Sequence, residues 1–336
     1  MITLKDIARL ANVSVTTASY ALNNRPEVNE QTRQRVLEIA RKHNYKPSGI
    51  ARDLKLRKTK TIGLILSNLA GPFYAEIIKG IEEITFSSNY NLVVCSSYGG
   101  KNSTAVRYLR EKRTDGILLM ASDIDDEIII ESANENFPII LLDRELDKDY
   151  IWCVTVDNEK GAYNAVKHLV SLGYRKIGYL SGPENSFDNQ QRFDGYKKAL
   201  QISSIDMQQR WFVHGQFTRK GGYSAAQALI ANKDIPEALF CGNDEMAIGA
   251  LEAFNDADIK VPERIAIAGF DDIELSTYVN PPLTTVKHPK YLLGSTATHM
   301  LIQALKKDYN ISNIKLDTQL IIRQSCGYHF KKEGGE

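Results

Sequence analysis

The sequence predicts a small all-helical head followed by an α/β core of two Rossmann-like halves, each built on a parallel sheet. Three observations predict this fold class. Apolar residues in the first 43 positions repeat at helical spacing, in short stretches separated by polar turns. From Thr61 onward, short apolar runs alternate with amphipathic stretches, and this alternation occurs twice. The 336 residues are also too many for one typical domain.

Two helices joined by a tight polar turn open the chain. The first has one apolar face, formed by Leu4, Ile7, Ala8 and Ala11. Asn12-Val13-Ser14 ends it, and the Ser14 hydroxyl can accept a hydrogen bond from the Thr17 amide and cap the second helix. The outer face of the second helix keeps short, mostly uncharged side chains, namely Val15, Thr16, Thr17 and Tyr20. Such a helix fits the DNA major groove, so the pair predicts a DNA-binding helix-turn-helix.

A third helix is expected from a cap at Asn29 to about His43. Charge supports DNA docking at this end of the chain. Residues 1–60 hold 13 Lys+Arg and 5 Asp+Glu, a net of +8, whereas the remainder has a net of −7 and the whole chain +1. A basic head neutralises phosphates, and the acidic remainder is repelled from a duplex.

The core elements follow from the alternation beyond Thr61. The apolar runs expected to be strands are Ile62–Leu66, Leu92–Cys95, Gly116–Met120, Ile139–Leu142, Ile177–Leu180, Ala238–Cys241 and Ile265–Ala268. Helices are expected between them, for example at Tyr74–Phe86, Ala162–Leu172 and Met246–Ala257. The repeat breaks near Val156-Asp157-Asn158. Because ligands of parallel sheets bind at the carboxyl ends of the strands, the cleft between the two halves is the expected site.

Composition narrows the class of protein. No export signal and no apolar run of about 20 residues is visible, so we expect a cytoplasmic protein without a membrane partner. Cys95, Cys153, Cys241 and Cys326 are far apart in apolar contexts and are expected to be buried free thiols. The sequence contains no phosphate-binding loop, no dinucleotide-binding fingerprint, no metal-ligand cluster and no nucleophile–base set. It therefore predicts neither enzymatic activity nor a bound cofactor.

The amino-acid sequences of several segments resemble those of the LacI/GalR family of bacterial repressors. The matching segments are Thr3-Leu-Lys-Asp-Ile-Ala8, Val13-Ser14, Thr16-Thr-Ala-Ser19, Leu22-Asn23, Val28-Asn-Glu-Gln-Thr-Arg33, Asn44-Tyr-Lys-Pro47, Ala51-Arg-Asp-Leu-Lys55 and Ile62-Gly63. The resemblance then continues to about Arg323. It implies a DNA-binding head at 1–46, a hinge helix and linker at 47–59 and an effector-binding, dimerising core at 60–336 with the fold of periplasmic binding proteins. Within the core, we expect one subdomain at about 60–157 and 288–315 and the other at about 158–287 and 316–330.

The resemblance also assigns DNA contacts. Contacts to DNA phosphates fix the register of a protein on the duplex. The residues expected to make them are Thr3, Ser14, Thr17, Ser19, Asn23 and Thr32. Val15, Thr16 and Tyr20 match the family's base-reading positions, and Tyr45, Ala51, Leu54 and Lys55 complete the expected DNA surface. Two hinge helices pair in the minor groove in this family, and Leu54 stands where a leucine from each wedges into the central base step. A hinge this short, containing Gly49, is a marginal helix in water, so we expect it to become helical only on DNA.

An effector pocket is implied where polar residues follow the apolar runs. The residues that match the family pocket, and most closely that of ribose-binding proteins, are Phe73, Tyr74, Asp143, Arg144, Arg192, Phe217, Asn243, Asp271 and Lys287. Carboxylates and an amide accept bonds from hydroxyls, Arg donates in a rigid fork and aromatic rings stack on sugar faces. Arg192 is expected just after a strand. Because the pocket residues most closely match those of ribose-binding proteins, ribose is the first effector that we expect. Lys287 stands where an amide or histidine is usual, and Ala121 lies near the place of a polar amide, so another sugar or a sugar phosphate is the second.

The mechanism implied is a population shift in a homodimer on a palindromic operator. Sugar in the cleft favours one setting of the two core halves, and through the hinges it changes operator affinity. Inducer and corepressor would use the same cleft. The chain ends in Lys331-Lys-Glu-Gly-Gly-Glu336 without a leucine-heptad tail, so no tetramer is expected. The alternatives are a global carbon regulator with a phosphocarrier protein or sugar phosphate as corepressor and, more distantly, a sugar-binding protein without regulation.

Overall fold

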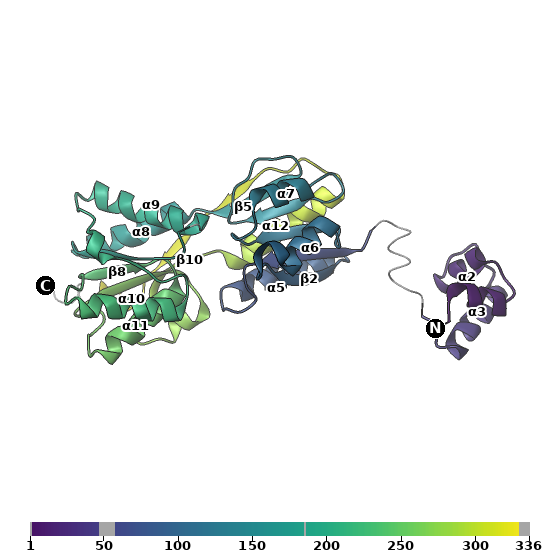
Figure 1. The fold of residues 1–336 in the computed structure, drawn as a ribbon, viewed down its shortest axis with the longest axis horizontal. Helices are drawn as coiled ribbons and strands as arrows, with labels where there is room; N and C mark the ends of the chain where they lie inside the picture. The colour runs from purple at the N-terminus through teal and green to yellow at the C-terminus, as the bar shows by residue number, and fades with distance from the viewer. Residues whose placement is uncertain (1, 47–57, 185, 329–336) are drawn as a thin grey trace. The chain divides into compact units, whose positions relative to one another are not determined.

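The computed structural model describes residues 2–46, 58–184 and 186–328. The chain forms two compact units, Met1–Lys60 and Thr61–Glu336, and the second consists of two sheet-based lobes (Figure 1). The all-helical head and the two parallel-sheet halves of the core are thus as predicted. The predicted hinge contacts Ala51, Leu54 and Lys55 lie outside the described residues.

The head contains α1 (Leu4–Leu10), α2 (Val15–Leu22) and α3 (Glu30–Lys42). The Ser14 hydroxyl caps α2 by accepting a hydrogen bond from the Thr17 amide at 3.0 Å, as predicted. Asn29 caps α3, accepting from the Thr32 amide at 2.8 Å. The small core of this unit is made of Ile7, Ala8, Ala11, Ala18, Ala21, Val28 and Val36. The local signals for capping and apolar spacing therefore placed all three helices correctly.

The first core lobe is built on a six-stranded parallel sheet in the order β11-β5-β4-β3-β1-β2. The strands are β1 (Thr61–Leu66), β2 (Asn91–Ser96), β3 (Gly116–Met120), β4 (Ile139–Leu142), β5 (Ile151–Val156) and β11 (Ile314–Leu316). Helices α5 (Tyr74–Ser87) and α12 (Lys290–Leu305) pack on one face, and α6 (Thr104–Glu111) and α7 (Asp126–Ser132) on the other. Leu64 faces the first layer and Ile65 the second, as strand alternation requires.

The second lobe repeats the architecture, with strand order β12-β10-β9-β8-β6-β7. Its strands are β6 (Ile177–Ser181), β7 (Phe212–His214), β8 (Ala238–Cys241), β9 (Ala266–Asp271), β10 (Thr284–Lys287) and β12 (Gln319–Ile321), the last antiparallel to β10. One face carries α8 (Asn158–Ser171) and α9 (Phe187–Ile202), and the other carries α10 (Arg219–Ala231) and α11 (Asp244–Asp256). Short 3₁₀ turns lie at Gly100–Asn102, Gln209–Trp211 and Glu274–Thr277.

Three crossings connect the lobes: β5 to α8, β10 to α12, and β11 to β12. The carboxyl ends of both sheets meet where these crossings lie, which is where a cleft is expected. All four cysteines are buried free thiols, as predicted. Burial raises the pKa of the Cys95 thiol to about 11. Among the described residues, every helix is too short or too polar to cross a bilayer.

Candidate functional site

A cleft of about 440 Å³ lies between the two lobes of the core. It is lined by the segments that follow β1, β3, β4, β6, β7, β8 and β9, together with the start of α5 and of α9. The lining residues are Ser67, Asn68, Ala70, Gly71, Pro72, Phe73, Tyr74, Met120, Ala121, Ser122, Leu142, Asp143, Arg144, Pro183, Ser186, Phe187, Asp188, Arg192, Gln216, Phe217, Thr218, Asn243, Glu245 and Asp271. Eight of the nine predicted effector-binding residues are among them.

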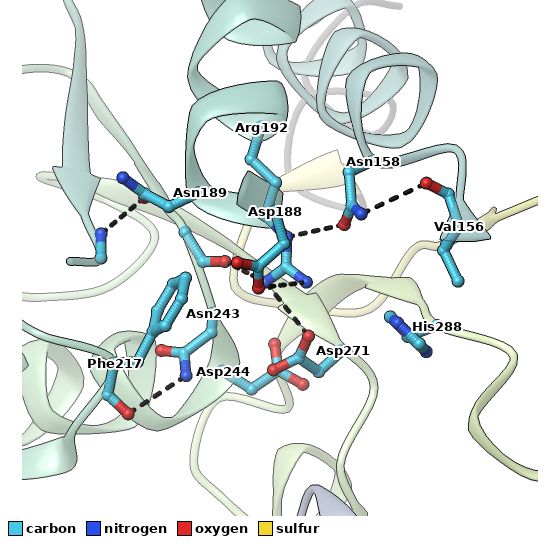
Figure 2. A network of polar contacts seen from close by, with 12 residues as sticks. Val156, Asn158, Asp188, Asn189, Arg192, Phe217, Asn243, Asp244, Asp271 and His288 are labelled. Carbon is cyan, nitrogen blue, oxygen red and sulfur yellow. Dashed lines mark hydrogen bonds and ion pairs between the residues drawn. The ribbon is translucent and has the colours of Figure 1, made fainter. Parts of the chain in front are cut away.

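Arg192 lies at the centre of the polar network on one wall (Figure 2). Its side chain is 2% exposed, and it donates to the Gly242 carbonyl at 2.7 Å and to Asn158 Oδ1 at 2.9 Å. Asp271 Oδ1 lies 3.2 Å from one terminal nitrogen and Asp188 Oδ2 lies 3.5 Å from the other. The residue stands inside α9 and not directly after a strand, which corrects the predicted location. The i, i+4 spacing of Asp188 and Arg192, which is typical of a helical ion pair, was the signal in the sequence for a helix here.

Asp143 connects the two lobes through hydrogen bonds. Its Oδ1 accepts from the Val156 amide and from Asn158 Nδ2, both at 3.1 Å, and its Oδ2 lies 3.1 Å from His288 Nε2. Burial opposes ionisation of Asp143, but the bond with His288 and the charges of His288 and Arg192 outweigh it, so the pKa lies below its ordinary value. Asn158 in turn accepts a hydrogen bond from Arg192, so polar contacts run from His288 through Asp143, Asn158 and Arg192 to Asp271. Figure 2 shows the part from Asn158 through Arg192 to Asp271.

Asp271 is the least satisfied carboxylate of the cleft. Its Oδ1 is buried and has no hydrogen-bond partner among the described residues, although the ion pair with Arg192 is close. Burial raises its pKa to about 6 against the lowering effect of Arg192, His288 and Lys290. The neighbouring Asp244 is structural: Thr285 and the Ile273 amide donate to it, and burial raises its pKa far above the ordinary value. A ligand hydroxyl would give Asp271 the donor that it lacks.

Aromatic side chains form the apolar part of the cleft. Phe73 and Tyr74, at the start of α5, contact each other edge to face with ring centroids 5.4 Å apart. Burial, with a smaller effect of Asp188, raises the pKa of the Tyr74 hydroxyl to about 12, so Tyr74 is neutral and can donate. The ring of Phe217 lies 5.6 Å from the Arg192 guanidinium. Rings on both lobes can therefore cover the C–H faces of one small ligand.

Two predicted side chains are already bonded within the protein. Arg144 donates to the carbonyls of Ala121 and Ile124 and pairs with Asp126, so its fork is occupied by the protein. Asn243 caps α11 by accepting from the Met246 amide and donates to the Phe217 carbonyl. Both residues line the cleft, but their observed bonds shape its wall.

Lys287, a predicted effector contact, is not brought to the cleft. It is exposed at the end of β10 and is absent from the cleft lining, because strand alternation turns Val286 and Lys287 to opposite sides. His288, the next residue, is buried instead and contacts Asp143 and the ring of Phe73. Asn158 and Asp188 were not among the site residues predicted from the sequence. The Asp157-Asn158 helix start was the available signal for the first.

The head presents the predicted DNA contacts unevenly. Val15 is 43% exposed and Thr16 is exposed, whereas Thr17, Ser19, Tyr20, Thr32 and Tyr45 are half-buried. Tyr20 and Tyr45 pack against the core of the head. The hydroxyls of Thr3 and Ser14 serve as helix caps, and Asn23 donates to the Ser19 carbonyl. Val15 and Thr16 are thus the most accessible of the three base-reading candidates.

A helix-turn-helix unit and a two-lobed core with a polar cleft together define a ligand-responsive DNA-binding regulator. Comparison with known proteins agrees with this class. Residues 3–48 match bacterial regulatory proteins of the lacI family, and residues 59–324 match the periplasmic binding proteins and sugar binding domain of the LacI family. The chain therefore belongs to the LacI family and is a DNA-binding transcriptional repressor with a ligand-binding core.

Individual relatives cover nearly the whole chain. The HTH-type transcriptional repressor PurR of Photobacterium profundum is 37% identical over 97% of this chain and 98% of its own. The ribose operon repressor of Haemophilus influenzae is 36% identical over the same shares. The lac repressor dimer bound to operator and the anti-inducer ONPF is 28% identical over 97% of this chain and 99% of its own, with a TM-score of 0.81.

Proposed function

We propose that this repressor responds to a small uncharged sugar, with ribose as the first candidate, bound in the cleft between the core lobes. As a homodimer on a palindromic operator, it would change operator affinity when the sugar favours one setting of the lobes. The observation that carries the proposal is the charge balance of the cleft.

Charged side chains in the cleft lining are mostly acidic. Four carboxylates, namely Asp143, Asp188, Glu245 and Asp271, face two guanidiniums, Arg144 and Arg192. Both arginines already contact carboxylates, and Lys287 lies outside the lining. A phosphate would meet a net negative wall, whereas hydroxyl donors would meet acceptors. These features support an uncharged polyol over a sugar phosphate.

Two comparisons support a pentose in particular. One relative is named a ribose operon repressor. A LacI-family regulator from Enterococcus faecium, solved with bound ribose, is 27% identical over 79% of this chain and 98% of its own, with a TM-score of 0.72. Phe73 and Phe217 line the cleft from the two lobes, and aromatic rings can stack on the C–H faces of a sugar.

Calorimetry on the full chain tests the proposal with D-ribose, D-glucose, cellobiose and D-ribose 5-phosphate. We expect D-ribose to bind, and at 100 times its Kd to stabilise the core by about 2.7 kcal/mol. Asp271→Asn should weaken binding, and Asp258→Asn, an exposed control at a left-handed turn position, should not. Tighter binding of the phosphate than of the parent sugar would refute the charge argument.

Operator binding in the same titration gives the direction of control. Fluorescence anisotropy with labelled operator, with and without D-ribose, shows whether the sugar releases or recruits the repressor. If no sugar changes operator affinity but a phosphorylated carrier protein does, the sugar proposal fails and the alternative of a carbon-catabolite regulator replaces it.

A further inference from the structure

Lys290 is buried in a place that disfavours its charge. It is the first residue of α12, and its side chain is 2% exposed. Burial of an ammonium is unfavourable, and the amino end of a helix repels positive charge. Such a residue persists only where its bonds compensate for both effects.

Three acceptors from two lobes surround the ammonium. Nζ donates to the carbonyls of Asp271 at 2.6 Å and Asp272 at 3.0 Å, both at the end of β9 in the second lobe. Glu76 Oε1, in the first turn of α5 in the first lobe, lies 3.3 Å away. The lysine therefore joins the two walls of the cleft without lining it.

The backbone that Lys290 holds is in an unusual conformation. Asp271 and Asp272 have φ angles of 114° and 53°, so two successive residues with side chains lie in the region that favours glycine. Other contacts of Asp272 support the same turn: Thr285 Oγ1 accepts from its amide at 3.4 Å, and Arg323 and Ser276 donate to its carboxylate at 2.6 Å and 3.4 Å. With this turn in place, the Asp271 carboxylate lies 3.2 Å from Arg192 in the cleft.

We propose that Lys290 is a positioning residue for the effector. It holds the Asp271-Asp272 turn so that the Asp271 carboxylate meets the ligand. Through Glu76, it also links that turn to α5, which carries Tyr74 on the opposite wall. The identity of the ligand, but not the role of the lysine, rests on the proposed function.

Hydrogen exchange on the ligand-free full chain tests the anchoring directly. The amides of Ile273 and His288, which donate to Asp244 and to the Asp271 carbonyl, report on the turn. Lys290→Met should speed their exchange by roughly tenfold or more, with α8 unchanged. Lys287→Met, which removes an exposed lysine nearby, is the control and should change neither. Unchanged exchange at the turn, or equal acceleration throughout the core, overturns the proposal.

Calorimetry with D-ribose then tests the role in binding. Lys290→Met should raise the Kd by roughly tenfold or more, with sugar-free operator affinity within about twofold of the parent. Glu76→Gln, which keeps the lysine, should act in the same direction but less. In an Asp271→Asn background, Lys290→Met should raise the Kd much less than it does in the parent, because most of its effect passes through Asp271. Additive losses would overturn the proposal, since they indicate a general structural role. If the parent protein binds no sugar, the proposed function fails and the exchange result alone decides on Lys290.

Discussion

Replacing Arg192 with methionine removes the charge at the centre of the cleft while keeping an unbranched side chain that fills part of the same space. Arg192→Met deletes two hydrogen bonds, to Asn158 and to the Gly242 carbonyl, and two ion pairs, with Asp188 and Asp271. Because Asp271 is buried, it loses its neutralising partner without gaining solvent. The variant should therefore lose both sugar binding and core stability, with operator binding retained.

The size of the stability loss follows from the burial of the partners. Removing one member of a buried ion pair costs about 3–5 kcal/mol. We expect the lower end, about 3 kcal/mol at pH 7, because Asp188 is 24% exposed and Asp271, with a pKa of about 6, takes up a proton readily once Arg192 is gone. A loss of this size lowers the Tm of a large domain by roughly 6–12 °C.

Differential scanning calorimetry of the full chain measures the loss, and a second substitution tests its cause. Arg192→Met combined with Asp271→Asn should be more stable than Arg192→Met alone, because the unpaired charge is gone. Arg210→Met is the control: it breaks an exposed pair with Asp234 and should cost less than about 1 kcal/mol. A Tm for Arg192→Met within about 2 °C of the parent, or no recovery in the double variant, would show that the buried charge of Asp271 does not depend on Arg192.

Three further predictions concern pH, the head and helix packing. Burial raises the pKa of Asp271 to about 6 from an ordinary 3.8, so the folded state binds this proton more tightly than the unfolded state does. The stabilisation that the proton provides is therefore full below about pH 4 and is lost as pH rises through 6. Relative to Asp271→Asn, the parent should therefore lose up to about 3 kcal/mol of unfolding free energy across that range, measured by urea titration, and a flat difference would contradict the assignment. Ser14→Ala should destabilise α2 by about 1 kcal/mol through loss of the cap on the Thr17 amide, seen as faster exchange in α2 and weaker operator binding, whereas unchanged exchange would show that the cap is dispensable. Gly195→Ala should separate α9 from α8, because a Cβ there would overlap the Glu159 carbonyl, and so weaken sugar binding by moving Arg192, an idea that fails if affinity is unchanged.

The elements predicted well are those whose signals are local or whose burial is complete. Caps at Ser14 and Asn29 act within three residues, so they can be read directly from the sequence. Strands such as β4 are buried on both faces and therefore appear as continuous apolar runs. By contrast, β11 and β12 are three residues long and mostly partly exposed, and they exist through pairing with β5 and β10, more than 30 residues away. That information is not contained in any short window of sequence.

The cleft shows a different limit of sequence reasoning. Polar residues at strand ends are easily found, and Asp143 and Asp271 were found in that way. Their remaining capacity to bind a ligand is set by partners far along the chain. Asp143 accepts bonds from Val156 and Asn158 and contacts His288, whereas Asp271 Oδ1 has an ion pair with Arg192 and no hydrogen-bond partner among the described residues. Two aspartates with the same sequence signature thus differ in their contacts: the first connects the lobes to each other, and we propose that the second binds the effector. Since a ligand gains most from a buried acceptor that lacks a donor, Asp271 is where the sugar hydroxyl should contribute most to the binding free energy.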